Sequence, residues 1–166
     1  LLGSYNRLVR PVRNSSTTLK VEMKLHLQQI MHVDGKNQII ELNAWLRYSW
    51  IDYRLMWKPD KYGNISSTRF MGEANQIWLP DILMHNSVNE DFDSTYKSNQ
   101  VVYNSGEVNW VPPGIFRASC KMDITYFPFD YQTCHLEVRA KTGYEQAIDL
   151  STYTNNGEWR LISLIR

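Results

Sequence analysis

The sequence predicts an all-β domain, built as a sandwich or a barrel. Apolar and polar residues alternate from Leu19 to Leu27, which is typical of a strand with one buried face. Turn signals then recur at short, fairly regular intervals, among them Asp34-Gly35, Asn104-Ser105-Gly106 and Asn155-Asn156-Gly157. Aromatic residues make up 13% of the chain, and they favour sheets and interfaces.

The elements can be placed in order along the chain. The only helix that we expect is a short one before Pro11, where the proline would end it. The first strand covers residues 19–27, and its alternation places Leu19, Val21, Met23, Leu25 and Leu27 on one buried face. The other expected extended runs are residues 38–48, 53–57, 76–78, 82–84, 101–103, 115–127, 132–140 and 159–165. Because no linker or repeat interrupts them, we expect residues 1–166 to form one domain.

The charges are nearly balanced, with 18 basic and 17 acidic residues giving a net charge of +1. A partner such as nucleic acid or an anionic membrane usually requires a strong basic excess, so neither is expected. No stretch of the sequence approaches the roughly 18 consecutive apolar residues that a membrane-spanning helix needs.

The sequence shows no sign of an enzyme. Its four histidines, at positions 26, 32, 85 and 135, are scattered without the spacing of metal ligands. No nucleophile elbow, phosphate loop or dinucleotide-binding motif is present. We therefore expect no catalytic residue, no metal and no cofactor.

Two cysteines and two sequons bear on the compartment. Cys120 and Cys134 enclose thirteen residues, and the bare pair is compatible with two buried thiols or with a disulfide. The sequons Asn14-Ser15-Ser16 and Asn64-Ile65-Ser66 favour a secreted chain with glycans on Asn14 and Asn64. Within the enclosed segment, a proline between two aromatic residues predicts a cis-peptide turn at Phe127-Pro128.

The cysteine pair and its contents resemble the signature of the Cys-loop receptors, a family of pentameric ligand-gated ion channels. The resemblance lies in the thirteen-residue spacing and in Phe127-Pro128-Phe129-Asp130 inside it. Matching segments occur in the same order at residues 33–38, 45–47, 50–57, 77–82, 112–116 and 157–159. From about Tyr5 onward, the chain resembles the extracellular domain of the nicotinic acetylcholine receptor branch.

The resemblance implies an immunoglobulin-like β-sandwich of about ten strands with a short N-terminal helix, cut before its last hairpin. It implies a Cys120–Cys134 disulfide and a coupling loop, Phe127, Pro128, Phe129 and Asp130, that faces a transmembrane domain. Five homologous subunits would surround a pore at the extracellular face of the plasma membrane. Between neighbours, a principal and a complementary face would hold a small cationic neurotransmitter such as acetylcholine through cation–π attraction.

The complementary face is the better preserved of the two. Trp45, Arg47, Val101, Asn109 and Val111 match its positions in the family. The alternative for Trp45 is a core tryptophan. In an extended strand Trp45 lies on the same face as Arg47 and on the opposite face from Leu46. The alternation therefore favours an exposed interface position for Trp45.

The principal face is degenerate. Trp78 is retained, but His85 stands where the family has tyrosine and Lys141 where it has tryptophan. Neither replacement suits a cationic ligand, because an ammonium group repels it and imidazole is a poorer cation host than phenol. The alternative is that His85 and Lys141 are plain solvated residues. The third principal loop would follow Arg166, so the chain resembles a non-alpha or accessory subunit that lends its complementary face.

Two other functions fit the same fold. One is a secreted soluble pentamer like the acetylcholine-binding proteins, and the other is a truncated decoy subunit. Four apolar spans downstream in the parent sequence would favour the channel, whereas an early stop would favour the soluble protein.

Overall fold

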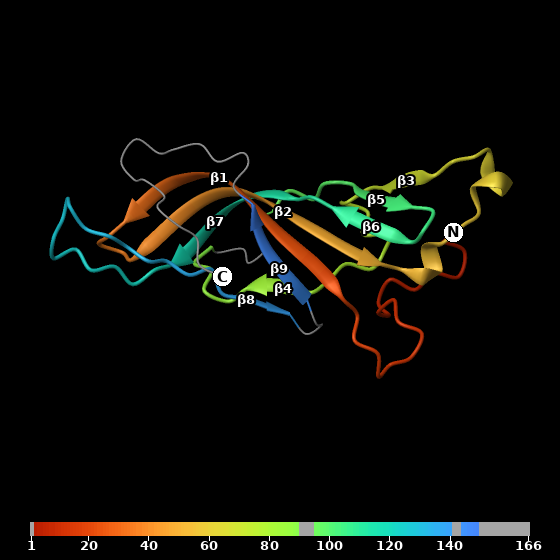
Figure 1. The fold of residues 1–166 in the computed structure, drawn as a ribbon, viewed down its shortest axis with the longest axis horizontal. Helices are drawn as coiled ribbons and strands as arrows, with labels where there is room; N and C mark the ends of the chain where they lie inside the picture. The colour runs from red at the N-terminus through yellow and green to blue at the C-terminus, as the bar shows by residue number, and fades with distance from the viewer. Residues whose placement is uncertain (1, 90–94, 141–143, 150–166) are drawn as a thin grey trace.

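In the computed structural model, which describes residues 2–89, 95–140 and 144–149, nearly all regular structure is β-strand. The strands are β1 (Val21–Asp34), β2 (Ile39–Ile51), β3 (Ser67–Phe70), β4 (Ile82–Met84), β5 (Gln100–Tyr103), β6 (Glu107–Trp110), β7 (Pro113–Ser119), β8 (Val138–Ala140) and β9 (Tyr144–Asp149), with 3-10 helices η1 (Tyr53–Leu55) and η2 (Pro59–Tyr62). Within these residues β4 and β8 form a small sheet and the other strands form a main sheet of seven (Figure 1). The predicted all-β fold is confirmed.

The long antiparallel ribbon of β1 and β2 is the backbone of the main sheet. Its pairing runs from Val21 opposite Trp50 to Asp34 opposite Ile39. The predicted turn after Asp34 is present, and the Asp34 carboxylate accepts hydrogen bonds from the amides of Asn37 (2.9 Å) and Lys36 (3.0 Å). Those bonds, the Asn37 amide first, hold the pKa of Asp34 below its usual range.

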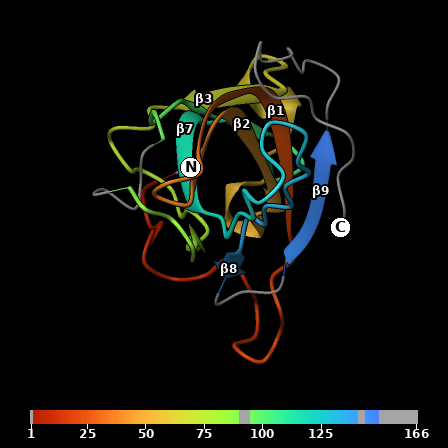
Figure 2. The same ribbon diagram turned by 90° about the vertical axis from the view of Figure 1, so that its left-hand side faces the viewer.

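β2 lies in the middle of the main sheet and uses both of its edges. One edge pairs with β1, and the other pairs first with β7 along Ile39–Trp45 and then with β6 along Tyr48–Ile51. β5 and β3 continue the sheet beyond β6, while β9 runs parallel to β1 at the opposite side. Figure 2 shows the main sheet as a curved layer, with β9 beside β1. β8 of the small sheet lies on the open side of this curve.

The inner face of the main sheet carries the core. Buried apolar side chains alternate along the strands as predicted, with Val21, Met23, Leu25, Leu27, Ala44, Leu46, Tyr48, Trp50, Val102, Val108, Phe116 and Ala118 among them. The rings of Tyr48 and Trp110 stack at 5.2 Å. A cavity of about 240 Å³ remains between the sheets, lined by Leu46 and Tyr48 on one side and by Ile82 and Val138 on the other. The arrangement is that of a β-sandwich.

A buried polar cluster closes the far end of β2 at Asp52, which is fully buried. The Arg54 guanidinium donates from Nε and Nη2 to the two Asp52 oxygens at 3.0 and 2.8 Å, and the Tyr5 hydroxyl donates to Oδ2 at 2.6 Å. The Trp78 amide in turn donates to the Tyr5 oxygen at 2.9 Å. Burial, and then the bond to Asp52, raise the pKa of Tyr5 well above its ordinary value.

A glycine completes the same corner. Gly106 adopts φ +84° in the turn between β5 and β6, a conformation that side chains disfavour. Its carbonyl accepts a hydrogen bond from the Asp52 amide at 2.8 Å. A Cβ on Gly106 would lie 2.7 Å from the Asp52 carbonyl oxygen, so only glycine fits this contact.

The expected N-terminal helix is wrong. Residues 2–10 form turns, with hydrogen bonds from Tyr5 N to the Leu2 carbonyl and from Val9 N to the Asn6 carbonyl. A helix this short gains little stability alone, since its first turn orders several residues for one hydrogen bond. Instead, Arg54 Nη1 donates hydrogen bonds to two carbonyl oxygens of this segment, that of Asn6 at 3.0 Å and that of Val9 at 2.9 Å.

Several strand predictions were also wrong in extent or kind. Residues 53–57 begin as η1, because the Asp52 carboxylate caps the Arg54 amide, and residues 76–78 are not a strand. The runs at 115–127 and 132–140 shrink to β7 and β8, while β3, β6 and β9 had not been predicted. The predicted strand at 159–165 lies outside the described residues.

Candidate functional site

Trp45 lies on the outward face of β2. Its side chain is 46% exposed, so it is not a core tryptophan, whereas its neighbours Ala44 and Leu46 are buried. In the strand register Trp45 stands opposite His26 on β1 and Pro113 on β7. The ring is therefore presented to the outside from the centre of the main sheet.

The neighbouring outward positions form a polar row across β2 and β6. Arg47 Nη2 donates to Asn109 Oδ1 at 3.3 Å, and Asn109 Nδ2 donates to Glu107 Oε1 at 2.7 Å. Asn109 is paired in register with Ser49 on β2 and with Val101 on β5. Trp45, Arg47, Asn109 and Val101 consequently share one face of the sheet.

Val111, the fifth predicted complementary position, lies just beyond the end of β6 and is half-buried. Its carbonyl accepts a hydrogen bond from the Ser98 hydroxyl at 2.9 Å. The outward face thus combines an exposed indole with a mixed set of polar groups, in which Arg47 and Glu107 offset each other's charge.

Of the predicted principal-face residues, Trp78 and His85 are described, and they differ in burial. Trp78 is only 7% exposed and meets the Trp50 ring edge-on at 5.8 Å, so it belongs to the core. His85 is exposed in the turn after β4, where its amide donates to the Glu137 carbonyl at 2.6 Å. Lys141 lies outside the described residues, and its placement stays a prediction.

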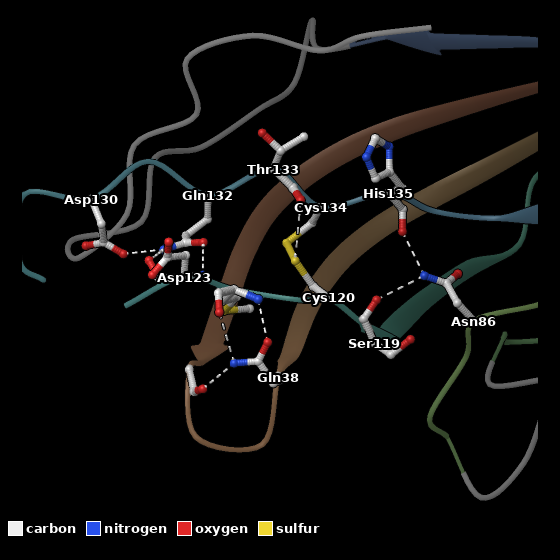
Figure 3. Close-up of a disulfide and its surroundings, with 12 residues drawn as sticks. Gln38, Asn86, Ser119, Cys120, Asp123, Asp130, Gln132, Thr133, Cys134 and His135 are labelled. Carbon is white, nitrogen blue, oxygen red and sulfur yellow. Dashed lines mark hydrogen bonds between the residues drawn. A yellow bond between two sulfur atoms is a disulfide. The ribbon is translucent and has the colours of Figure 1, made fainter. Parts of the chain in front are cut away.

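The disulfide between Cys120 and Cys134 is present, with an S–S distance of 1.96 Å and a Cα–Cα distance of 5.1 Å (Figure 3). The segment that it closes, residues 120–134, is called the cysteine loop below. The predicted cis peptide at Phe127-Pro128 is also found. At the tip of the cysteine loop Tyr126, Phe127, Phe129 and Tyr131 are between 70% and 87% exposed. The predicted coupling residues Phe127 and Phe129 are thus part of an uncovered aromatic end.

Side-chain amides hold the base of the cysteine loop. Gln38 lies at the turn before β2, and its backbone carbonyl accepts a hydrogen bond from the Cys120 amide at 2.8 Å. Its side-chain amide donates to the Met122 carbonyl and accepts from the Met122 backbone amide. Gln132 similarly accepts from the Asp123 amide at 3.0 Å and donates to the Asp123 carbonyl at 2.7 Å. These bonds take the place of a strand ladder.

The Asp123 carboxylate makes a local turn at the same base. The Thr125 hydroxyl and the Thr125 amide both donate to its Oδ1. These two bonds, the hydroxyl first, hold the pKa of Asp123 below its usual range. On the other arm Gln132 also bonds Asp130, the last residue of the predicted coupling motif.

The contacts of Asn86 were not predicted from the sequence. Its amide nitrogen donates to the carbonyls of Ser119 (3.1 Å) and His135 (2.7 Å) (Figure 3). Its Oδ1 accepts from the Glu137 amide at 2.9 Å. A lone asparagine in a turn has no pattern that marks such a role. Only the fold, which places the turn after β4 beside the two ends of the cysteine loop, makes it visible.

The two predicted glycan acceptors are both accessible. Asn14 is exposed in a turn in which its Oδ1 accepts from the Ser16 amide at 3.1 Å. Asn64 is exposed with φ +61° in the turn between η2 and β3. Figure 1 places η2 and β3 at the end of the molecule opposite the cysteine loop.

Over residues 2–89, 95–140 and 144–149, no group of three or more His, Cys, Asp and Glu side chains is placed to hold a metal ion. Nor does this part of the chain contain a helix of the length and apolarity that membrane crossing requires.

Comparison with known proteins gives consistent matches. The sequence model of the neurotransmitter-gated ion-channel ligand-binding domain matches residues 1–165. Acetylcholine receptor subunit alpha-type acr-7 of Caenorhabditis elegans is 52% identical over 98% of this chain and 34% of its own length. Subunit alpha-type acr-16 of the same nematode is 49% identical, over 97% and 34%. Neuronal acetylcholine receptor subunit alpha-2 of Mus musculus is 40% identical, over 98% and 33%. The chain thus spans about a third of these relatives.

Proposed function

This chain belongs to the neurotransmitter-gated ion-channel ligand-binding domain family, and we propose that residues 1–166 serve as one ligand-binding and assembly domain of an acetylcholine-gated cation channel subunit. Its partners would be homologous subunits in a pentamer, and its place the extracellular, postsynaptic-type face of the plasma membrane. The similar proteins are named as acetylcholine receptor subunits, which supports this choice of ligand. The family is one of channel receptors, so the expectation that the chain is not an enzyme is confirmed.

The observation that carries the proposal is the outward indole of Trp45 within the row of Arg47, Asn109 and Val101. An exposed tryptophan can host a cation on its face, and aromatic residues dominate the energetics of interfaces. A tryptophan that is 46% exposed in the single chain is stabilised most when a neighbour and a ligand cover it. We therefore assign this face to the complementary half of an intersubunit site, with Val111 at its border.

The principal half is assigned to the neighbouring subunit. Trp78 is committed to the core, and its ring is not available to a ligand. His85 is a weak cation host, and Lys141 would repel an ammonium ligand. A complete acetylcholine site then requires a partner that brings its own aromatic principal face.

The test is acetylcholine binding by a receptor assembled from the full-length subunit and an alpha-type partner. Trp45→Ala should weaken binding by about 2-fold to 30-fold, the range that one cation–π contact of about 0.5–2 kcal/mol implies. Trp45→Phe should retain part of the affinity. Ile51→Ala, a change at another outward position of β2 that is 49% exposed, is the matched control.

Two results would contradict the assignment. Unchanged acetylcholine affinity in assembled Trp45→Ala receptors would remove Trp45 from the site. Full binding by pentamers of this subunit alone would show that its own principal face works.

We also propose N-linked glycans on Asn14 and Asn64, because both side chains are exposed in turns at sites with the acceptor sequence. Glycosidase treatment should shift the gel band of the secreted parent chain by the mass of two glycans. Ser16→Ala and Ser66→Ala should each reduce this shift by one glycan, and Ser4→Ala should leave it unchanged. A secreted chain without any glycan would refute this assignment.

A further inference from the structure

The Asn86 side chain makes three hydrogen bonds to backbone groups on both sides of the disulfide. The side chain sits between two chain segments that are far from it in sequence, near residues 119 and 135. Its Nδ2 protons are both used, one on the Ser119 carbonyl and one on the His135 carbonyl, and Oδ1 takes the Glu137 amide. The backbone carbonyl of Asn86 also accepts from the Ser119 amide at 2.9 Å.

The contacts flank the disulfide on both sides. Ser119 directly precedes Cys120, and His135 directly follows Cys134, so one amide group bridges the two arms next to the covalent bond (Figure 3). Residues 120–137, all of them described, contain no strand. Without a backbone ladder, the spacing of the arms depends on the disulfide, on Gln132 and on Asn86.

The chemistry of the contact requires a primary amide of this length. Two donors and one acceptor are needed, because two carbonyls and one amide hydrogen face the side chain. Aspartate would offer only acceptors and would place a negative charge against the two carbonyl oxygens. Alanine would leave all three backbone groups without their partner, which is costly where they are shielded from water.

The other neighbour of Asn86 is His85. The His85 amide donates to the Glu137 carbonyl at 2.6 Å, and the Glu137 amide donates to Asn86 Oδ1. The turn and residue 137 are therefore joined by two hydrogen bonds. A displacement of the His85 turn therefore shifts the atoms that hold both arms of the cysteine loop.

We propose that Asn86 is a positioning residue that transmits movement of the turn carrying His85 to the cysteine loop. The consequence for channel opening rests on the function proposed above, whereas the positioning itself is a property of the chain alone. Among the described side chains, Asn86 is the one that bonds the residues next to both half-cystines.

The first experiment measures amide hydrogen exchange in the chain and in three variants. In Asn86→Asp, exchange over residues 119–137 should become about tenfold faster or more, as expected when the backbone groups at the base of the cysteine loop lose their hydrogen-bond partners. The effect should be smaller in Asn86→Ala, which lacks the repulsive charge. Asn104→Asp, the same change at a half-buried site in the turn between β5 and β6, should leave these amides unchanged.

The pattern of exchange separates positioning from plain stability. A local effect leaves the paired amides of β1 and β2 as slow as in the parent chain, whereas a general loss of stability speeds all protected amides together. Unchanged exchange at residues 119–137, or an equal rise throughout the main sheet, would overturn the proposal.

The second experiment uses the full-length subunit assembled with an alpha-type partner and acetylcholine as the probe. Asn86→Asp should raise the concentration for half-maximal current about tenfold or more, with a change in closed-state binding of less than about threefold. Parallel shifts of binding and current would overturn transmission through Asn86. If the parent receptor gives no acetylcholine current, the proposed function fails, and the exchange experiment still decides whether Asn86 positions the loop.

Discussion

The two ends of β2 are fastened in opposite ways. Beyond Ile51 the chain enters a buried, charged cluster in which Asp52 is fully enclosed by Arg54, Tyr5 and the Gly106 turn. Before Ile39 it meets the cysteine loop through neutral amides, chiefly that of Gln38, beside a disulfide and an uncovered aromatic tip. Figure 1 shows the two ends far apart along the long axis of the molecule.

The two kinds of contact indicate which end of β2 can move. A buried ion pair is held by its surroundings, because separating the charges leaves one of them without compensation. Neutral amide bonds at a half-exposed base are worth about 1 kcal/mol each and can be exchanged for water. The Asp52 end is therefore fixed, whereas the cysteine-loop end is able to shift as a covalently closed unit.

The largest effect is expected from breaking the charged end. Arg54→Ala leaves the Asp52 carboxylate buried without its counter-charge, so the free energy of unfolding should fall by about 3–5 kcal/mol. Denaturant titration followed by tryptophan fluorescence measures it. Arg69→Ala, at an exposed arginine on β3, is the matched control and should cost little. A loss of less than about 1 kcal/mol would show that water reaches Asp52.

Breaking the covalent closure of the other end should have the next largest effect. Replacing Cys120 and Cys134 by serine should lower the free energy of unfolding by about 3 kcal/mol, because the unfolded chain regains the entropy of the closed loop. Combining this change with Arg54→Ala should give additive losses, since the two sites are separate. Strong non-additivity in a double-mutant cycle would mean that the two ends of β2 are coupled.

Tyr5 should give the charged end an alkaline limit. Its pKa is raised in the folded chain, by burial first and by the bond to Asp52 second, so its contribution is complete below the ordinary value of 10.0 and is lost as pH rises above it. Tyr5→Phe should cost about 1–3 kcal/mol near neutral pH and flatten the alkaline loss of stability. Tyr103→Phe, at an exposed position, should leave that pH profile unaltered.

Asp123 should give the cysteine-loop end a small acid limit. Its pKa is lowered, so the stabilisation is present above the ordinary value of 3.8 and disappears as pH falls through the folded value. Asp123→Asn should remove this dependence, with only a slight change in melting temperature at neutral pH because the group is exposed. An identical acid profile for Asp123→Asn and the parent chain would contradict the assignment. Asp60→Asn serves as the control at the opposite end.

The parts of the fold that could be predicted from the sequence are those with strict alternation. The first half of β1 and most of β2 follow period two, because one face is buried along their whole pairing. Prediction stopped short after Leu27, where the register shifts twice between β1 and β2 and the alternation is interrupted. The run after Asp52 was taken for a strand because a capping carboxylate leaves no mark in hydrophobic periodicity.

The candidate site was predictable only where local parity decides it. Trp45 could be assigned to the outside from its immediate neighbours, and it is exposed. Trp78 could not be placed in this way, since its burial depends on Trp50 and on Tyr5, which are distant in sequence. The same holds for Asn86, whose partners lie 33, 49 and 51 residues away.

The length of β2 sets the separation of its two anchors. The thirteen residues Ile39–Ile51 in extended conformation span roughly 40 Å, between the turn at Gln38 and the corner at Asp52. Deleting a single residue within β2 would turn Trp45 inward and expose its buried neighbours. Deleting two would keep every side chain on its own face but draw the anchors closer by roughly 7 Å. The length of β2 can therefore change only in steps of two residues if every side chain is to keep its face of the sheet.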